Sequence, residues 1–247
     1  MKSTRAARRP LSPIELPDPD EFDLPPFPGF GSEGLKFLRQ LKKNNDREWM
    51  TPERKRIYAD HLQTPMQLLL EELRARFLEE ELPFSPDPKK GIFRLYRDTR
   101  FSKDKTPYKT HIGAAIPFRG EGKDGLGNYI HIEPGKCFYG GGAYFVESSG
   151  LHSLRAAIDR DPSELREILT ELGGEFGELE GARLKRNPTG YAIDHPAIDL
   201  LRFKQMWLSK TFPDSLATSR DLVDWIVIRT RELTRFNSYL HGAIRGA

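Results

Sequence analysis

Residues 94–111, RLYRDTRFSKDKTPYKTH, interleave cations with aromatic side chains. The run holds three arginines, three lysines and one histidine in eighteen residues. A guanidinium group is planar and stays charged, and its fork of N–H donors pairs with phosphate or carboxylate through two hydrogen bonds. We therefore predict a site for an anionic small molecule, phosphorylated or carboxylated, with catalysis as an open question. The predicted anion-binding residues are Arg94, Arg97, Arg100, Lys105 and Tyr108.

The backbone has to bend for these cations to meet. In an extended chain, positions 94 and 100 would lie about 20 Å apart at ~3.3 Å per residue, too far to share one phosphate. Asp98 can close a turn onto the backbone two residues further on, so we expect a strand that ends near Arg97. Asp98 and Asp104 are expected to offset part of the repulsion between the cations. Tyr96 is expected to add hydrogen bonding or stacking.

The same run allows two other interpretations. Phe101, Tyr96 and Tyr108 could stack on bases among the cations, which would make the chain a nucleic-acid-binding module. Alternatively, acidic and basic residues alternate at Arg97–Asp98 and Lys103–Asp104. The cluster would then be an internal ion-pair network in a structural or interaction domain. The sequence leaves these alternatives open.

A second group of polar residues lies in YIHIE, residues 129–133. His131 and Glu133 would share one face of a strand, as candidates for a general base and its partner. Together with His111 they would bind a metal only if all three met in space, and no ligand spacing such as HExxH is present. The sequence therefore predicts no metal site, identifies no cofactor and does not show whether the protein is an enzyme.

The charge is local rather than spread along the chain. The net charge is +3 over 247 residues, whereas residues 89–111 hold eight Lys or Arg against two Asp and so carry +6. The mild total argues against a protein that coats nucleic acid.

The single cysteine, Cys137, excludes an intramolecular disulfide and fits a reducing compartment. No apolar run is long enough for a membrane span, and none follows the basic N-terminus as in a secretory signal. We expect a cytoplasmic protein without a membrane partner.

The surrounding patterns predict the elements that hold these residues. Helical spacing occurs before residue 81 and again from about residue 151, and short β-rich runs lie between them. This order predicts an α+β fold, with an antiparallel sheet in the middle of the chain and the N- and C-terminal helices packed mainly on one face. Residues 1–28 are predicted to be a flexible Pro-rich arm and residues 29–247 a single domain.

The alternation of side chains predicts which residues share the uncovered face. Phe93 and Leu95 are expected beneath the helices, and Arg94 and Tyr96 on the open face with His131 and its neighbours. Pro134-Gly135 predicts a type II turn between two hairpin strands. The glycines at 140–142 are interpreted as a β-bulge.

The basic run also resembles the signature of the bacterial domain-of-unknown-function 2461 (DUF2461) family, roughly R-x-x-R-D-x-R-F-x-x-[DN]-K-x-x-Y. Its fixed positions correspond to Arg94, Arg97, Asp98, Arg100, Phe101, Asp104, Lys105 and Tyr108. The wider resemblance runs from about residue 28 to residue 240 and includes FLRQLKKNNDREWM and YIHIEPG. The family is defined by sequence and has no established activity, so the resemblance implies no reaction.

Overall fold

The structure is a computed structural model that describes residues 25–123 and 125–246. Its centre is a four-stranded antiparallel sheet in the order β1-β2-β3-β4, which confirms the α+β prediction. The strands are β1 (Ile112–Pro117), β2 (Gly127–Ile132), β3 (Cys137–Ala143) and β4 (Met206–Phe212). Most of the predicted N-terminal arm lies outside the described residues. Phe27, near the predicted boundary, is fully buried, so the packed region includes it.

Helices precede the sheet, follow β3 and close the chain. The N-terminal group is α1 (Gly31–Lys43), α2 (Pro52–Tyr58), the π-helical turn η2 (Ala59–Gln63) and α3 (Thr64–Glu79). Between β3 and β4 lie α4 (Ser148–Arg160), α5 (Ser163–Phe176) and α6 (Ile198–Leu201). After β4 come α7 (Asp214–Ala217) and the long α8 (Leu222–Arg245).

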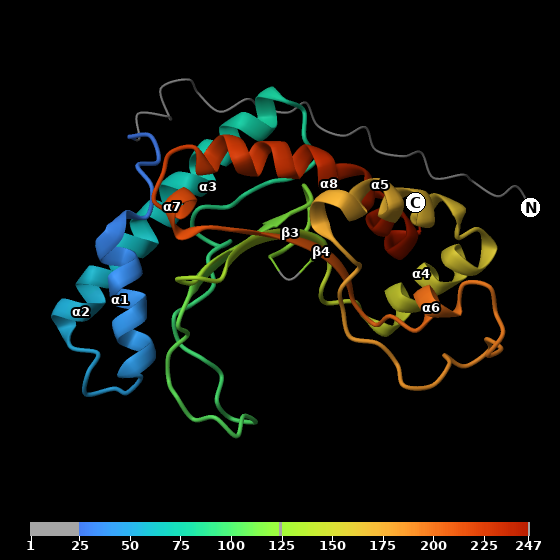
Figure 1. The fold of residues 1–247 in the computed structure, drawn as a ribbon, viewed down its shortest axis with the longest axis horizontal. Coiled ribbons are helices and arrows are strands. Elements are labelled where there is room, and N and C mark those ends of the chain that lie inside the picture. The colour runs from blue at the N-terminus through green and yellow to red at the C-terminus, as the bar shows by residue number, and fades with distance from the viewer. Residues whose placement is uncertain (1–24, 124, 247) are drawn as a thin grey trace, which may run out of the picture.

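One face of the sheet is covered and the other is open. Helices α3 and α8 lie across the convex face, and none of the helices in the described residues lies across the concave face (Figure 1). Ile130 and Ile132 of β2 point into the covered side and are fully buried, whereas the residues that alternate with them are only partly buried. Burying every second side chain of a strand is typical of an antiparallel sheet with one solvated face. The predicted packing of helices on one face is confirmed.

The hairpin between β2 and β3 fixes the register of the open face. Gly135 in its turn has φ +75°, a conformation that glycine adopts without strain and that a type II turn needs at this position. Pairing of β3 with both neighbours continues through Gly140, Gly141 and Gly142 without an inserted residue. The predicted bulge is therefore wrong, because these glycines belong to a regular strand.

Residues 91–110 form an irregular hairpin, the basic arm, which leads into β1. Its first side pairs antiparallel with β1 through the Phe93 N–H to Gly113 carbonyl bond of 2.9 Å, and with its own second side through the Lys109 N–H to Leu95 carbonyl bond of 2.8 Å. Pairing ends with the Arg97 N–H to Pro107 carbonyl bond of 2.9 Å, close to the predicted strand end. The tip, residues 98–106, projects beyond the sheet on its open side (Figure 1).

The basic arm corrects the predicted faces of its first side. Ile92 pairs with Ala114, which pairs in turn with the fully buried Ile130. Directly paired residues point to the same side of a sheet, so Ile92 faces the helices and Phe93 turns to the open face. The prediction for Phe93 is therefore wrong, while Leu95 packs against the core as expected.

Candidate functional site

A hollow of about 430 Å³ lies over the open face of the sheet. Its lining is largely apolar and aromatic, and Gly140 and Gly142 provide a floor without side chains, beside Phe138 on the same face of β3. Such a mixture of apolar wall and few polar groups is typical of small-molecule sites. The side chains that line it include Phe93, Lys109, His111, Lys123, Tyr129, His131, Phe138 and Trp207.

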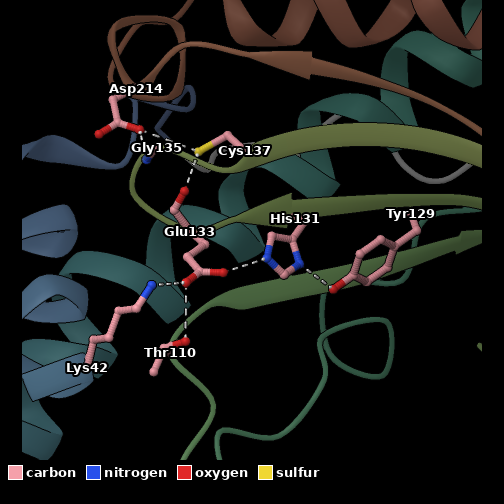
Figure 2. A network of polar contacts seen from close by, with 8 residues as sticks. All are labelled: Lys42, Thr110, Tyr129, His131, Glu133, Gly135, Cys137 and Asp214. Atoms are coloured by element: carbon pink, nitrogen blue, oxygen red, sulfur yellow. Dashed lines mark hydrogen bonds and ion pairs between the residues drawn. The ribbon is translucent and has the colours of Figure 1, made fainter. Parts of the chain in front are cut away.

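The polar centre of the hollow is a row of side chains on β2 and the residue that follows it. Tyr129, His131 and Glu133 alternate with buried isoleucines and point the same way (Figure 2). The Tyr129 hydroxyl lies 3.1 Å from His131 Nδ1, and His131 Nε2 lies 3.6 Å from Glu133 Oε2. The predicted common face of His131 and Glu133 is confirmed.

Glu133 is held by groups outside the strand. Lys42 of α1 donates from Nζ to Glu133 Oε1 at 3.1 Å, and the Thr110 hydroxyl donates to the same oxygen at 3.4 Å (Figure 2). Burial alone would raise the pKa of Glu133, but the Lys42 ammonium and the His131 ring outweigh it and lower the pKa. The carboxylate is therefore charged at neutral pH, with Oε2 directed at His131.

His111 approaches this row from the neighbouring strand. Ile112 pairs with Ile132, so the next position, 111, lies across from 133. The rings of His111 and His131 have centroids 4.1 Å apart. Burial, with His131 and Lys109 nearby, lowers the pKa of His111 to about 4. Burial also lowers the pKa of His131, against the opposing effect of Glu133. Both imidazoles are therefore neutral at pH 7.

Two lysines lie at one end of the hollow, beside Phe93. The ammonium nitrogens of Lys109 and Lys123 lie 5.2 Å and 5.7 Å from the Phe93 ring centroid. Burial lowers the pKa of Lys109, and the charges of Arg94 and Lys123 lower it further. Within residues 25–123 and 125–246, no carboxylate lies within 4 Å of the charged nitrogens of these three cations. Lys109 and Lys123 therefore carry positive charge without an ion-pair partner among the described residues, whereas the charge of Arg94 also acts on Asp98.

The other predicted cations lie at the tip of the basic arm and have their own partners. Arg97 contacts Asp104 and the Thr106 hydroxyl. Arg100 donates to Asp98 at 2.8 Å and 3.0 Å. The Thr106 N–H and then Arg97 lower the pKa of Asp104 to about 2, and Arg100 lowers the pKa of Asp98 to about 2.

Lys105 also points away from the hollow, because its Nζ donates to the Thr99 carbonyl at 2.9 Å. The structure does not gather Arg94, Arg97, Arg100 and Lys105 around one point. Among the four, Arg94 is the one whose charge acts on Lys109, and it also acts on Asp98, the partner of Arg100. The pairing at the tip matches the ion-pair alternative, while anion binding by these residues stays a prediction.

Tyr108 fastens the basic arm to the rest of the protein. The Asn45 side chain bonds both main-chain groups of Tyr108, at 2.9 Å to the carbonyl and 3.0 Å from the N–H. The Tyr108 ring is buried and lies 5.2 Å from the Tyr96 ring. Phe101, by contrast, is 95% exposed at the tip.

Several residues of the hollow were not predicted as site residues. In the sequence Lys109 contributes only to the local charge, and no pattern marks Lys123, Phe138 or Trp207 as site residues. One signal was present in the sequence: Phe138, Gly140 and Gly142 alternate along a strand, which predicts a large side chain beside an empty floor. Lys123 lies in a loop, and nothing local to it indicates where the loop folds.

The chain belongs to the DUF2461 family of conserved hypothetical proteins, whose model matches residues 33–239. This confirms the resemblance stated from the signature. No curated protein and no solved structure matches the chain. In the part of the chain that the structure describes, no helix combines the length and apolar character needed to cross a bilayer.

Proposed function

We propose that the protein binds an anionic small molecule in the hollow on the open sheet face. Lys109, Lys123 and Arg94 supply the positive charge, and the aromatic walls hold the rest of the ligand. The observation that carries the proposal is the proximity of Lys109 and Lys123, both beside Phe93 and neither with an ion-pair partner among the described residues. A phosphate or carboxylate at this end would relieve their mutual repulsion.

The shape of the hollow supports a ligand with a flat or apolar body. Its volume of about 430 Å³ lies in the range of roughly 300–1,000 Å³ that is usual for small-molecule sites. Phe138 stacks on His131 with centroids 4.7 Å apart, and Phe93 meets Tyr129 edge to face at 5.8 Å. A ring that bears one phosphate or carboxylate would fit both the walls and the cationic end.

The predicted site of Arg97, Arg100, Lys105 and Tyr108 remains a separate proposal for the arm. An anion there would have to displace Asp104 from Arg97 and Asp98 from Arg100. His131 and Glu133 remain candidates for acid–base catalysis in the hollow, since a neutral imidazole beside a carboxylate is able to accept a proton.

A thermal-shift screen of phosphorylated and carboxylated metabolites, followed by calorimetry, tests the proposal. Lys109→Gln should lower the affinity for the best ligand about tenfold or more, because a charge-assisted hydrogen bond contributes roughly 1.5–3 kcal/mol to binding. Lys103→Gln, at the exposed tip, is the matched control and should bind as the unmodified protein does. If no anion stabilises the protein, or if Lys109→Gln binds its ligand as tightly, the proposal is wrong.

A second candidate function rests on the exposed tip of the basic arm. Phe101 is 95% exposed and lies beside Arg100, an arrangement able to stack on a base and contact its phosphate. This proposal predicts that labelled single-stranded oligonucleotides bind with an affinity that falls steeply with salt. Phe101→Ala should abolish that binding and leave ligands of the hollow unaffected. If Phe101→Ala binds the oligonucleotides as tightly as the unmodified protein does, nucleic-acid binding by the tip is excluded.

A further inference from the structure

We propose that His111, His131 and Glu133 bind a divalent transition-metal ion of the Zn²⁺ type at the edge of the hollow. One nitrogen of each histidine and one oxygen of Glu133 lie within 4.8 Å of one another. The proposal goes beyond anion binding and does not depend on it.

The spacing of these donors is near that of a metal site. Ligand atoms around tetrahedral zinc lie about 3.3 Å apart, given bonds of roughly 2.0–2.1 Å. His131 Nε2 and Glu133 Oε2 are already 3.6 Å apart. His111 has to approach by at most about 1.5 Å to complete such a set, since all separations are within 4.8 Å. Within the described residues its ring nitrogens have no hydrogen-bond partner, so no bond has to break for the ring to turn.

The surrounding groups orient two of the three donors. Tyr129 contacts His131 at Nδ1, which leaves Nε2 directed at Glu133. Lys42 and Thr110 contact Oε1 of Glu133, which leaves Oε2 directed at His131 (Figure 2). Metal ligands in proteins are commonly held in this way by partners on their far side, which fix the ring and carboxylate orientation.

The donor types select the class of metal. Two imidazoles and one carboxylate suit Zn²⁺, Fe²⁺ and similar ions, whereas Mg²⁺ and Ca²⁺ prefer oxygen ligands throughout. Three protein ligands leave at least one coordination position open, as in catalytic zinc sites. Because His111 and His131 both line the hollow, that position would face the ligand-binding space.

A second histidine–carboxylate pair provides a matched control. His195 Nε2 lies 2.9 Å from Asp159 Oδ1, and its Nδ1 accepts from the Ala197 N–H at 3.1 Å. This pair belongs to no cluster of three potential ligands among the described residues. A loss of binding in His195→Gln would therefore indicate zinc bound elsewhere on the surface.

The test titrates Zn²⁺ into the full chain, stripped with EDTA and free of organic anions, by calorimetry. We expect one zinc per chain, and Co²⁺ should give visible absorption bands on binding. His111→Gln, His131→Gln and Glu133→Gln should each lower the affinity for zinc by more than about 100-fold. Loss of a residue that only hydrogen-bonds a metal ligand already lowers metal affinity roughly 10–100-fold. His195→Gln should bind as the unmodified protein does.

Circular dichroism checks that each variant is folded. Tyr129→Phe keeps all three ligands and should lower the affinity for zinc about tenfold. It replaces a ligand variant as the test if that variant fails to fold. Zinc that binds without saturation at one per chain, or equally to the three ligand variants, overturns the proposal. Lys109→Gln should retain zinc, so failure of the metal site and failure of the anion site give different results.

Discussion

The Tyr129 hydroxyl and His131 Nδ1 lie 3.1 Å apart, two residues along the same face of β2. Burial raises the pKa of Tyr129, so the phenol keeps its proton and is able to donate it to the imidazole. In the metal-free protein that bond would place the ring proton on Nε2, toward Glu133; with a metal at Nε2 the ring proton would lie on Nδ1 and the phenol oxygen would accept it. The Tyr129–His131 contact joins the aromatic wall of the hollow to its polar centre. It requires the space beside Gly113, a residue of the neighbouring strand β1.

Gly113 makes that space. A Cβ at this position would lie 2.2 Å from the Tyr129 hydroxyl oxygen, so Gly113→Ala should push the ring away and lengthen its bond to His131. We expect a loss of roughly 1–3 kcal/mol in the free energy of unfolding, as for other overpacked sites. Urea denaturation measures it. Gly122→Ala, where a Cβ meets no atom within 4 Å, is the control and should cost much less. Equal stabilities of the two variants would contradict the prediction.

Protonation of His111 should destabilise the metal-free protein in mild acid. Its pKa is lowered from 6.5 to about 4 by burial, by His131 and by Lys109, while Glu133 opposes the shift. The unfolded chain therefore binds a proton between these values and the folded chain does not, so stability is full above pH 6.5 and falls toward pH 4. Between pH 7 and pH 5 the loss should be about 2 kcal/mol.

Urea denaturation at both pH values measures this loss, and His111→Gln should remove most of it. His152→Gln, on the exposed part of α4, should retain the full pH dependence. If His111→Gln and the unmodified protein lose the same free energy, the imidazole is not the group responsible.

Asn45 should control the mobility of the basic arm. Its side chain bonds both main-chain groups of Tyr108, and Asn45→Ala removes both bonds. We expect trypsin to cleave after Arg100, Lys103 or Lys105 several-fold faster, because local opening exposes the tip. Asn44→Ala is the control, since that amide bonds only the Gln40 carbonyl of its own helix. Unchanged cleavage in Asn45→Ala would show that other contacts hold the arm.

The hydroxyl pair behind the sheet predicts an asymmetric mutational effect. Tyr139 and Thr230 share a buried bond of 2.7 Å, and Thr230 donates to the Ile226 carbonyl at 2.8 Å. Thr230→Val leaves the fully buried Tyr139 hydroxyl unsatisfied and should cost roughly 1–3 kcal/mol. Tyr139→Phe leaves Thr230 its bond to Ile226 and should cost about 1 kcal/mol. Thermal or urea unfolding compares them, and the reverse order would refute the assignment of donors.

Local patterns in the sequence determined the class of fold and much of one strand. The alternation in YIHIE predicts that His131 and Glu133 share a face, because successive residues of a strand point to opposite sides. Pro134-Gly135 predicts the turn after it, because only a residue that tolerates positive φ fits there. The density of cations in residues 94–111 is also a property of the sequence alone.

The tertiary structure decided which of these residues meet. Charge density predicts that cations lie near one another, but it does not predict that Arg97 and Arg100 turn to Asp104 and Asp98 while Lys109 lies beside Phe93 without a carboxylate among the described residues. His111 reaches His131 only through the register of β1 against β2, and Lys42 reaches Glu133 only because α1 packs beside that edge. Pairing register and helix packing depend on contacts between segments distant in sequence, and no local spacing of residue types encodes them.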